Sequence, residues 1–234
     1  MPVPPARSLP AATRRRAPAA SPRERIDETA YELFSSRGVR AVGIDELVAR
    51  SGVAKMTLYR HYPSKEALAI AFLRRREALW TRDWLQAEVE RRAQVPAERL
   101  LAIFDIFDAW FRRADFEGCS FINVLLETDG KDHPVRRAAA QHLATIRVFL
   151  AGLAEQAGVA DAQAFAHQWH ILMKGSIVAA GEGDRKAALR ARAMGRLLLT
   201  ASGIETADAP PAKKPARGAA ARAHSVGRKP SIDR

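Results

Sequence analysis

Apolar residues recur at helical spacing along most of this chain. In the first such segment, Ile26, Ala30, Leu33 and Phe34 fall at i, i+4, i+7 and i+8, which places them on one face of a helix. No segment shows the alternation of apolar and polar residues that is typical of strands, and no internal repeat stands out. The pattern predicts an all-α fold of about nine helices, over residues 21–38, 44–51, 54–61, 64–92, 96–114, 121–127, 133–157, 161–180 and 185–201.

Several of these helices carry recognisable start and stop residues. The run Ser21-Pro22-Arg23-Glu24 places Ser at the N-cap, Pro at N1 and Glu at N3, which is a capping box. Gly38 is expected to end the same helix. Ser64 is the expected cap of the long helix over residues 64–92, in which Leu68, Phe72, Leu79 and Leu85 are expected to pack on one side.

Residues 44–61 form the segment most informative about function. Ile44, Leu47 and Val48 lie on one face of a short helix that ends at Gly52, which has no Cβ to obstruct a tight turn into a second short helix. Val53 and Leu58 are expected to fill the angle between the two helices. This pattern predicts a helix-turn-helix, whose second helix enters the major groove of DNA. Its outward surface would consist of Lys55, Met56, Thr57, Tyr59, Arg60 and His61.

The run from Gly52 to Leu68 resembles the signature of TetR-type transcriptional regulators. The resemblance is carried by Gly52-Val53-Ala54, Thr57-Leu58-Tyr59, His61 and Ser64-Lys65-Glu66. It is specific over residues 21–70 and extends to about residue 202 only as a helical pattern. Two positions depart from the commonest form: Gly43 replaces a Thr or Ser, which removes a side-chain acceptor, and Met56 replaces a Gly, which is expected to alter base preference.

The resemblance implies roles for the residues of the second short helix. Thr57, Tyr59 and His61, together with Lys65 at the start of the next helix, correspond to phosphate-contacting positions. The side chains better placed for base edges are Lys55, Met56 and Arg60, because Lys and Arg donate to guanine and Met contacts a thymine methyl. Other interpretations remain open: Tyr59 as a core aromatic, Lys55 and Arg60 as solvated charges, and His61 as a packing residue.

The net charge of +12 is unevenly distributed. Residues 1–20 and residues 205–234 each contribute +4, so that only +4 remains for the rest of the chain. We expect a disordered basic arm over 1–20, a DNA-binding domain over 21–67, a helical ligand-binding and dimerisation domain over 68–202, and a disordered basic tail over 203–234. The tails could be simply solvated, could add salt-sensitive attraction to phosphates, or both.

The last two long helices carry a candidate dimerisation surface. One small three-helix head makes too few contacts for a specific site, and helix-turn-helix proteins usually bind as dimers. The resemblance implies that these two helices pair with their counterparts in a four-helix bundle. The alternative is that they belong only to the intramolecular core. The candidate dimerisation residues are Gly175, Ile177, Val178, Leu197 and Leu198.

Aromatic residues gather in the middle of the chain and suggest a binding site for a small effector. Cavities in helical proteins favour apolar linings with a few polar anchors. The resemblance implies a small, largely apolar inducer that changes the separation of the two heads. An aromatic stripe at helical spacing is equally typical of a core. The candidate effector-binding residues are Phe104, Phe107, Trp110, Phe111, Phe121, Asn123, His142, Trp169, His170 and Met173.

Other chemistries have weaker support. His167 and His170 lie at i, i+3, but no third and fourth metal ligand is evident. Cys119 is the single cysteine, which excludes an internal disulfide; redox sensing through it is an alternative, although its acidic neighbour Glu117 would disfavour a thiolate. No phosphate-binding loop or nucleophile elbow indicates an enzyme, and no cofactor or metal is expected.

Composition also bears on location and on one further alternative. No apolar run is long enough to span a membrane, and the N-terminal residues lack the apolar stretch of a secretory signal. A cytoplasmic protein is therefore expected. A basic architectural protein that coats DNA without sequence preference remains an alternative, favoured by the tails and opposed by the motif in residues 44–68. The sequence thus predicts a homodimeric regulator of transcription that binds double-stranded DNA, most simply a repressor released by its effector.

Overall fold

Nine helical rods make up residues 20–206, the part of the chain that the computed structural model describes, and this part contains no strand. The predicted all-α fold is therefore confirmed, whereas the predicted arms fall almost entirely on residues 1–19 and 207–234, outside the described residues. The elements are α1 (Pro22–Ala41), α2 (Ile44–Ser51), α3 (Lys55–His61), α4 (Lys65–Arg76), η1 (Glu77–Gln86), α5 (Ala87–Arg92), α6 (Pro96–Phe111), α7 (Ser120–Glu127), α8 (Pro134–Gln156), α9 (Ala162–Gly181) and α10 (Ala187–Ala201).

The elements α4, η1 and α5 form one continuous rod, as the sequence predicted for residues 64–92. The backbone keeps right-handed helical angles at both junctions, with φ −62° and ψ −47° at Glu77 and φ −60° and ψ −39° at Ala87. The middle segment, η1, is π-helical. Wider turns of this kind are rare and are frequently found at functional sites.

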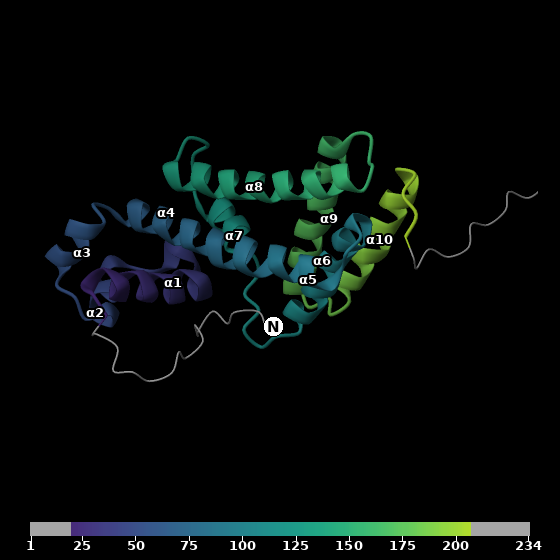
Figure 1. Ribbon diagram of the computed structural model, residues 1–234. Coiled ribbons are helices and arrows are strands. Elements are labelled where there is room, and N and C mark those ends of the chain that lie inside the picture. The colour runs from purple at the N-terminus through teal and green to yellow at the C-terminus, as the bar shows by residue number, and fades with distance from the viewer. Residues whose placement is uncertain (1–19, 207–234) are drawn as a thin grey trace, which may run out of the picture.

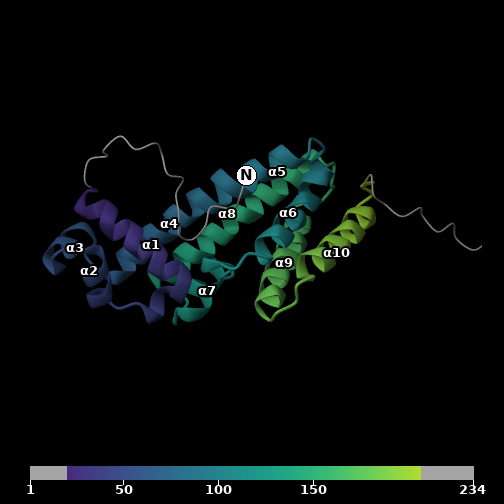
Figure 2. The same cartoon turned by 90° about the horizontal axis from the view of Figure 1, so that it is seen from below.

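The helices are arranged as a small head and a larger body (Figure 1). Helices α1–α3 form the head at one end of the molecule, and the rod that begins with α4 leads from the head into the body. Helix α8 packs along α4 and α7, and α9 and α10 pack together at the end farther from the head (Figure 2). The head therefore meets the body through α4 and α7, both of which contact α1.

Side-chain caps begin α1, α4 and α9. The Ser21 hydroxyl accepts from the Glu24 N–H at 3.2 Å, and the Ser21 N–H donates to the Glu24 carboxylate at 2.7 Å, which confirms the capping box. Ser64 and Asp161 cap α4 and α9 through the N–H groups of the third residue that follows each. Gly38 is only partly the expected stop: its φ of 78° and ψ of 164° break the helix, but one further turn continues to Ala41.

A single apolar core runs from the head into the body. In the head, Ile26, Leu47 and Leu58 are fully buried. The core continues into the body through Phe72 of α4, whose ring meets Tyr31 and Phe34 of α1 edge-on, with centroids 5.8 and 5.5 Å apart. Such ring pairs stabilise contacts beyond the area that they bury. Within residues 20–206, no helix combines the length and apolarity needed to cross a membrane.

Gly195 marks the closest approach of α10 to the core. A Cβ added there would lie 2.7 Å from Cη2 of Trp169 and 3.1 Å from Cε2 of Phe104. Both rings are fully buried and cannot move aside freely. By contrast, a Cβ on Gly152 of α8 would meet nothing within 4 Å.

Replacing Gly195 with Ala should destabilise the protein, because the added methyl overpacks a rigid aromatic pair, at a cost of about 1–3 kcal/mol. Gly152→Ala is the matched control, and it should be neutral or stabilising by up to about 1 kcal/mol, since Ala favours the helix over Gly. Urea unfolding of both variants measures the two free energies. Equal stabilities for the two variants would contradict the close packing at Gly195.

Candidate nucleic-acid interface and effector site

The turn between α2 and α3 sets the angle of the helix-turn-helix. Gly52 has φ 63° and ψ 30°, the left-handed conformation that favours glycine, and its N–H donates to the Val48 carbonyl at 3.1 Å. Val53 and Leu58 are 7% and 0% exposed. They fill the angle as predicted, so α3 is held with its opposite face outward.

That outward face carries the candidate DNA-binding side chains. Met56 is 73% exposed and Tyr59 is 37% exposed. Lys55, Arg60 and His61 are also exposed, and only Thr57, the sixth candidate on α3, is half-buried. Tyr59 and His61 are therefore not core residues of the isolated chain. The exposed face of α3 thus combines cationic, aromatic and apolar groups within seven residues.

Lys55 has an intramolecular partner. Its Nζ lies 2.8 Å from a carboxylate oxygen of Asp45 on α2, and this pairing raises the Lys55 pKa. Both side chains are more than half exposed. Exposed ion pairs contribute little to stability, so Lys55 can exchange Asp45 for another acceptor at little cost. Sequence reasoning did not identify Asp45, because ten residues separate the pair and only the turn at Gly52 brings them together.

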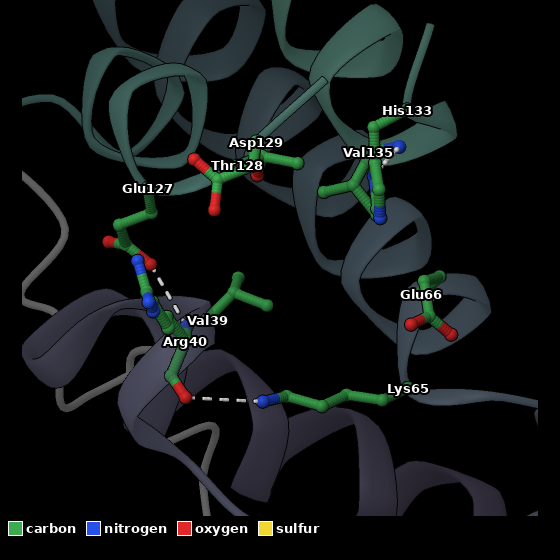
Figure 3. A pocket seen from close by; sticks show the side chains of 9 residues that line it. All are labelled: Val39, Arg40, Lys65, Glu66, Glu127, Thr128, Asp129, His133 and Val135. Carbon is green, nitrogen blue, oxygen red and sulfur yellow. Dashed lines mark hydrogen bonds between the residues drawn. The ribbon is translucent and has the colours of Figure 1, made fainter.

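Lys65 is placed differently from the other candidates. Its side chain is half-buried, and its Nζ donates to the Arg40 carbonyl at 3.4 Å (Figure 3). Burial lowers the Lys65 pKa. A phosphate contact from Lys65, which the resemblance implies, would require this side chain to leave Arg40.

Two further contacts fix the rest of the head around α3. Arg25 of α1 donates through Nε to the Ser51 carbonyl at 3.1 Å, next to the turn, and the Tyr62 hydroxyl donates to Asp27. Burial, followed by the bond to Asp27, raises the Tyr62 pKa. These contacts hold the C-terminal end of α2 and the C-terminal end of α3 against α1. No sequence motif indicated them, since each joins residues more than 20 positions apart.

In the body, most aromatic candidates form one continuous cluster. The centroids of Phe104 and Trp169 are 5.3 Å apart, and those of Phe107 and Trp110 are 5.5 Å apart. Sequence reasoning missed Trp80 and Trp84 of η1. Trp80 joins the cluster with its centroid 5.2 Å from that of Trp110, and Trp84 lies 5.3 Å from Trp80. Phe111, half-buried, borders the same cluster, and Met173 is buried on α9.

Some buried polar atoms near this cluster have no hydrogen-bond partner among the described residues. They are Nε1 of Trp80, Oγ1 of Thr81, Nε1 of Trp169 and Nδ1 of His170. Buried polar groups are normally satisfied, so such atoms need an explanation. Burial lowers the His170 pKa to about 3, which keeps the imidazole neutral. Indole N–H groups are donors only, so any partner at Trp80 or Trp169 must offer an acceptor.

The two other polar candidates have different surroundings. The His142 ring packs against Phe121 at a tilt of 34°, with centroids 5.3 Å apart, and burial lowers the His142 pKa. Asn123 donates to the Glu117 carbonyl at 3.4 Å and lines a cavity of about 360 Å³ between the α6–α7 loop and the end of α9. The lining of this cavity includes Phe116, whose centroid lies 4.9 Å from that of Trp110. Asn123 therefore borders the aromatic cluster through this cavity, whereas His142 pairs with Phe121.

The alternative redox and metal chemistries involve Cys119 and the pair His167 and His170. Cys119 is 7% exposed, and burial raises the pKa of its thiol, which disfavours a reactive thiolate. His167 is exposed whereas His170 is buried, so the two imidazoles do not face a common site. Among residues 20–206, no group of three or more His, Cys, Asp or Glu side chains could hold a metal ion.

Most of the dimerisation candidates are exposed or half-buried on α9 and α10. Val178 is 50% exposed and Leu197 is 71% exposed, Gly175 is exposed, and Leu198 is half-buried. Ile177 differs from the expectation, because it is 6% exposed and packs inside the chain. Ile177 directly precedes the exposed Val178, and the rotation of about 100° between neighbouring helical residues turns its side chain toward the core. Ile171 and Met194, at 62% and 55% exposure, extend the exposed face instead.

Comparison with known proteins agrees with this geometry. A family model described as bacterial regulatory proteins of the tetR family matches residues 26–72, which include all of α2 and α3. A second model, described as the tetracyclin repressor-like C-terminal domain, matches residues 96–194. Together the two models cover more than half of the chain.

Individual relatives match over different lengths. The transcriptional activator FasR of Mycolicibacterium smegmatis is 48% identical over 46 residues, which are 20% of this chain and 21% of that protein. The transcriptional regulator LmrA of Bacillus subtilis is 30% identical over 125 residues, 50% of this chain and 62% of that protein. The chain therefore spans less than two thirds of either relative. The crystal structure of a TetR transcriptional regulator from Streptomyces avermitilis superposes with a TM-score of 0.71 and 29% identity, over 80% of this chain and 100% of that chain.

Substitutions on the exposed face of α3 should separate two kinds of DNA contact. Tyr59→Ala should weaken binding to all duplexes, because Tyr59 is assigned to a phosphate. Arg60→Ala should cost about 1–3 kcal/mol and relax preference at one base pair, because Arg60 is assigned to a base edge. Fluorescence anisotropy with a selected duplex and its single-base variants measures both. Parent-like binding by both variants would refute the assignment.

Proposed function

The chain belongs to the TetR family of helix-turn-helix transcriptional regulators, and we propose that it acts as a homodimeric repressor that binds a palindromic operator and leaves it when a small, largely apolar effector binds. TetR-family transcriptional regulators are not enzymes, and their helix-turn-helix binds DNA. The observation that carries the proposal is the exposed face of α3, held outward by the turn at Gly52. We place the protein in the cytoplasm, where it meets its DNA.

Each exposed group on α3 has a use on DNA. Thr57, Tyr59 and His61 are assigned to phosphates, which position the protein without reading sequence. Lys55, Met56 and Arg60 are assigned to base edges in the major groove, where donors recognise guanine and an apolar group recognises a thymine methyl. Lys65 is assigned to a further phosphate, which it would reach on leaving Arg40.

The homodimer is supported by the apolar surface that a single chain leaves exposed. Ile171, Gly175 and Val178 follow one another at i, i+4 and i+7 on α9, and Met194 and Leu197 lie at i, i+3 on α10. Contiguous exposed apolar surface marks an interaction site. Pairing two chains through this surface would present two α3 helices to half-sites separated by about 34–36 Å or a multiple of that distance.

The effector proposal rests on the aromatic cluster and its unsatisfied donors. A flat or apolar molecule would contact Phe107 and Trp110, away from the closely packed rings of Phe104 and Trp169, and an acceptor on it would satisfy Nε1 of Trp80. Such a molecule releases DNA only if it binds one arrangement of the heads better than the other.

An activator is the second candidate, since FasR, which is similar over the head, is described as one. The α3 surface serves both functions equally, because activation and repression differ in where the protein sits on DNA. The redox alternative is disfavoured by the burial of Cys119 and the raised pKa of its thiol.

The decisive experiment is footprinting on DNA beside the protein's own coding region. The proposal predicts a protected palindrome, with transcription from that DNA reduced in the presence of the protein. A variant lacking residues 1–19 and 207–234 should keep the same footprint with a shallower salt dependence. An architectural protein would instead protect the duplex uniformly, and it would lose this protection when both tails are removed.

The dimer surface has its own test in a matched pair of variants. Leu197 and Val148 are both 71% exposed, but only Leu197 lies on the α9–α10 face. Leu197→Glu should give a monomer with weakened binding to the palindrome, because a carboxylate would be buried at the interface. Val148→Glu should remain dimeric and bind normally. Sedimentation and anisotropy measure the two properties, and a dimeric Leu197→Glu variant would contradict this interface.

A further inference from the structure

The backbone of one residue at the end of α1, Arg40, is held from two sides at the junction between head and body. The N–H of Arg40 donates to Oε2 of Glu127, the last residue of α7, at 2.9 Å. The carbonyl of Arg40 accepts from Nζ of Lys65, at the start of α4, at 3.4 Å. Figure 3 shows both bonds converging on the Arg40 backbone. A side chain of the body therefore bonds directly to the backbone of the head, 87 residues earlier in the chain.

Gly38 makes room for this contact. A Cβ at Gly38 would lie 2.2 Å from Oε1 and 2.8 Å from Cδ of Glu127, closer than real Cβ atoms come to other atoms. The φ of 78° at Gly38 also falls in the left-handed region that favours glycine. Two independent features, the absent side chain and the backbone turn, thus allow the carboxylate to reach the Arg40 N–H.

The position of Glu127 is itself fixed from α8. Nη1 of Arg136 donates to the Leu125 carbonyl and, at 3.1 Å, to the Thr128 carbonyl, so that it holds the end of α7. A carboxylate in the last turn of a helix opposes the helix dipole, and α7 has no basic residue in that turn. Stability of α7 therefore does not account for a glutamate here, whereas the contact with α1 does.

Apolar packing does not fill this part of the junction. A cavity of about 320 Å³ lies beside the contact, and its lining includes the charged or titratable side chains of Glu66, Asp129 and His133 (Figure 3). The bond from Glu127 crosses the junction next to this space. Because a hydrogen bond is directional, it constrains the angle of the head more narrowly than a loosely packed surface could.

We propose that Glu127 is a positioning residue for DNA binding: its carboxylate holds the end of α1 at Arg40 and thereby fixes the orientation of the head relative to the body. The inference rests on the proposed function, in which two heads must match two half-sites at once. Without the contact, each head would still fold, bind DNA and pack on α4, but that packing alone would allow a wider range of head angles, so the pair would hold one spacing less strictly.

The first test needs no DNA. Ala49 on α2 and Val148 on α8, both exposed, are replaced by cysteines for spin labelling in a Cys119→Ala background. Labelled chains are diluted with unlabelled protein, so that pulsed electron spin resonance measures the distribution of head–body distances within one chain. Glu127→Ala should broaden this distribution, whereas Glu127→Gln, which keeps an acceptor oxygen, should retain it. Glu155→Ala, at an exposed glutamate near the end of α8, is the control. A distribution for Glu127→Ala equal to that of the parent would overturn the proposal.

The second test uses the palindromic duplex that the parent protein selects from a random pool. Glu127→Ala should bind this duplex at least tenfold more weakly and discriminate less between half-site spacings, with unchanged affinity for random DNA. Glu127→Gln should remain within about threefold of the parent. Equal defects in both variants would mean that charge, and not the hydrogen bond, matters. If the parent selects no duplex, the proposed function fails, while the distance measurement still decides the role of Glu127.

A double-mutant cycle provides a measurement that does not depend on DNA or labels. Gly38→Ala should lower the melting temperature of the parent, because the methyl expels the carboxylate and strains the turn. In the Glu127→Ala background the collision is absent, so the same substitution should lower the melting temperature less. Strictly additive shifts would show that the two residues are not in contact and would overturn the proposal.

Discussion

The orientation of the DNA-binding head depends on a single helix that belongs to two packed interfaces at once. Helix α1 packs against both α2 and α3, and its residues Ile26 and Leu33 are buried in the core. Its residues Tyr31 and Phe34 lie edge-on against Phe72 of α4, with centroids 5.8 and 5.5 Å apart. Because packed cores are dense and resist deformation, α4 cannot shift without moving α1, and α1 cannot move without α3.

The continuous rod α4–η1–α5 connects this contact to the centre of the body. Phe72 lies in its first third, while Trp80 and Trp84, further along, pack against the aromatic residues of α6. A rigid helix with different partners at its two ends is the kind of contiguous element through which two sites can be coupled. The polar contact at Arg40 is a second, independent link between head and body, and it differs in kind. The apolar contact at Phe72 resists separation, whereas the hydrogen bond from Glu127 is sensitive to angle.

Sequence reasoning succeeded where structure is local. The capping box at Ser21, the long rod over residues 64–92 and the turn at Gly52 each depend on residues within a few positions of one another, and each is present as predicted. It was less successful on which face of a long helix is buried. Leu68, Phe72 and Leu85 are buried as expected, but Leu79 is only half-buried and Trp80 and Trp84 are buried as well. The π-helical turns of η1 explain this, since their wider spacing rotates the buried face away from the 3.6-residue pattern.

The sequence by itself determined the all-α fold, the helix-turn-helix and the exposed cationic and aromatic residues of α3. These features depend on apolar periodicity, helix caps and one left-handed glycine, each of which involves only residues close together in the chain. Only the tertiary structure decided that Lys65 faces the Arg40 carbonyl, that Ile177 packs inward while Ile171 stays exposed, and that Trp80 and Trp84 join the aromatic cluster. Only the tertiary structure, too, brought Glu127 to Gly38 and Arg40. These outcomes depend on how whole helices rotate and approach one another, which is set by the summed packing of residues far apart in the chain and leaves no short-range pattern to read.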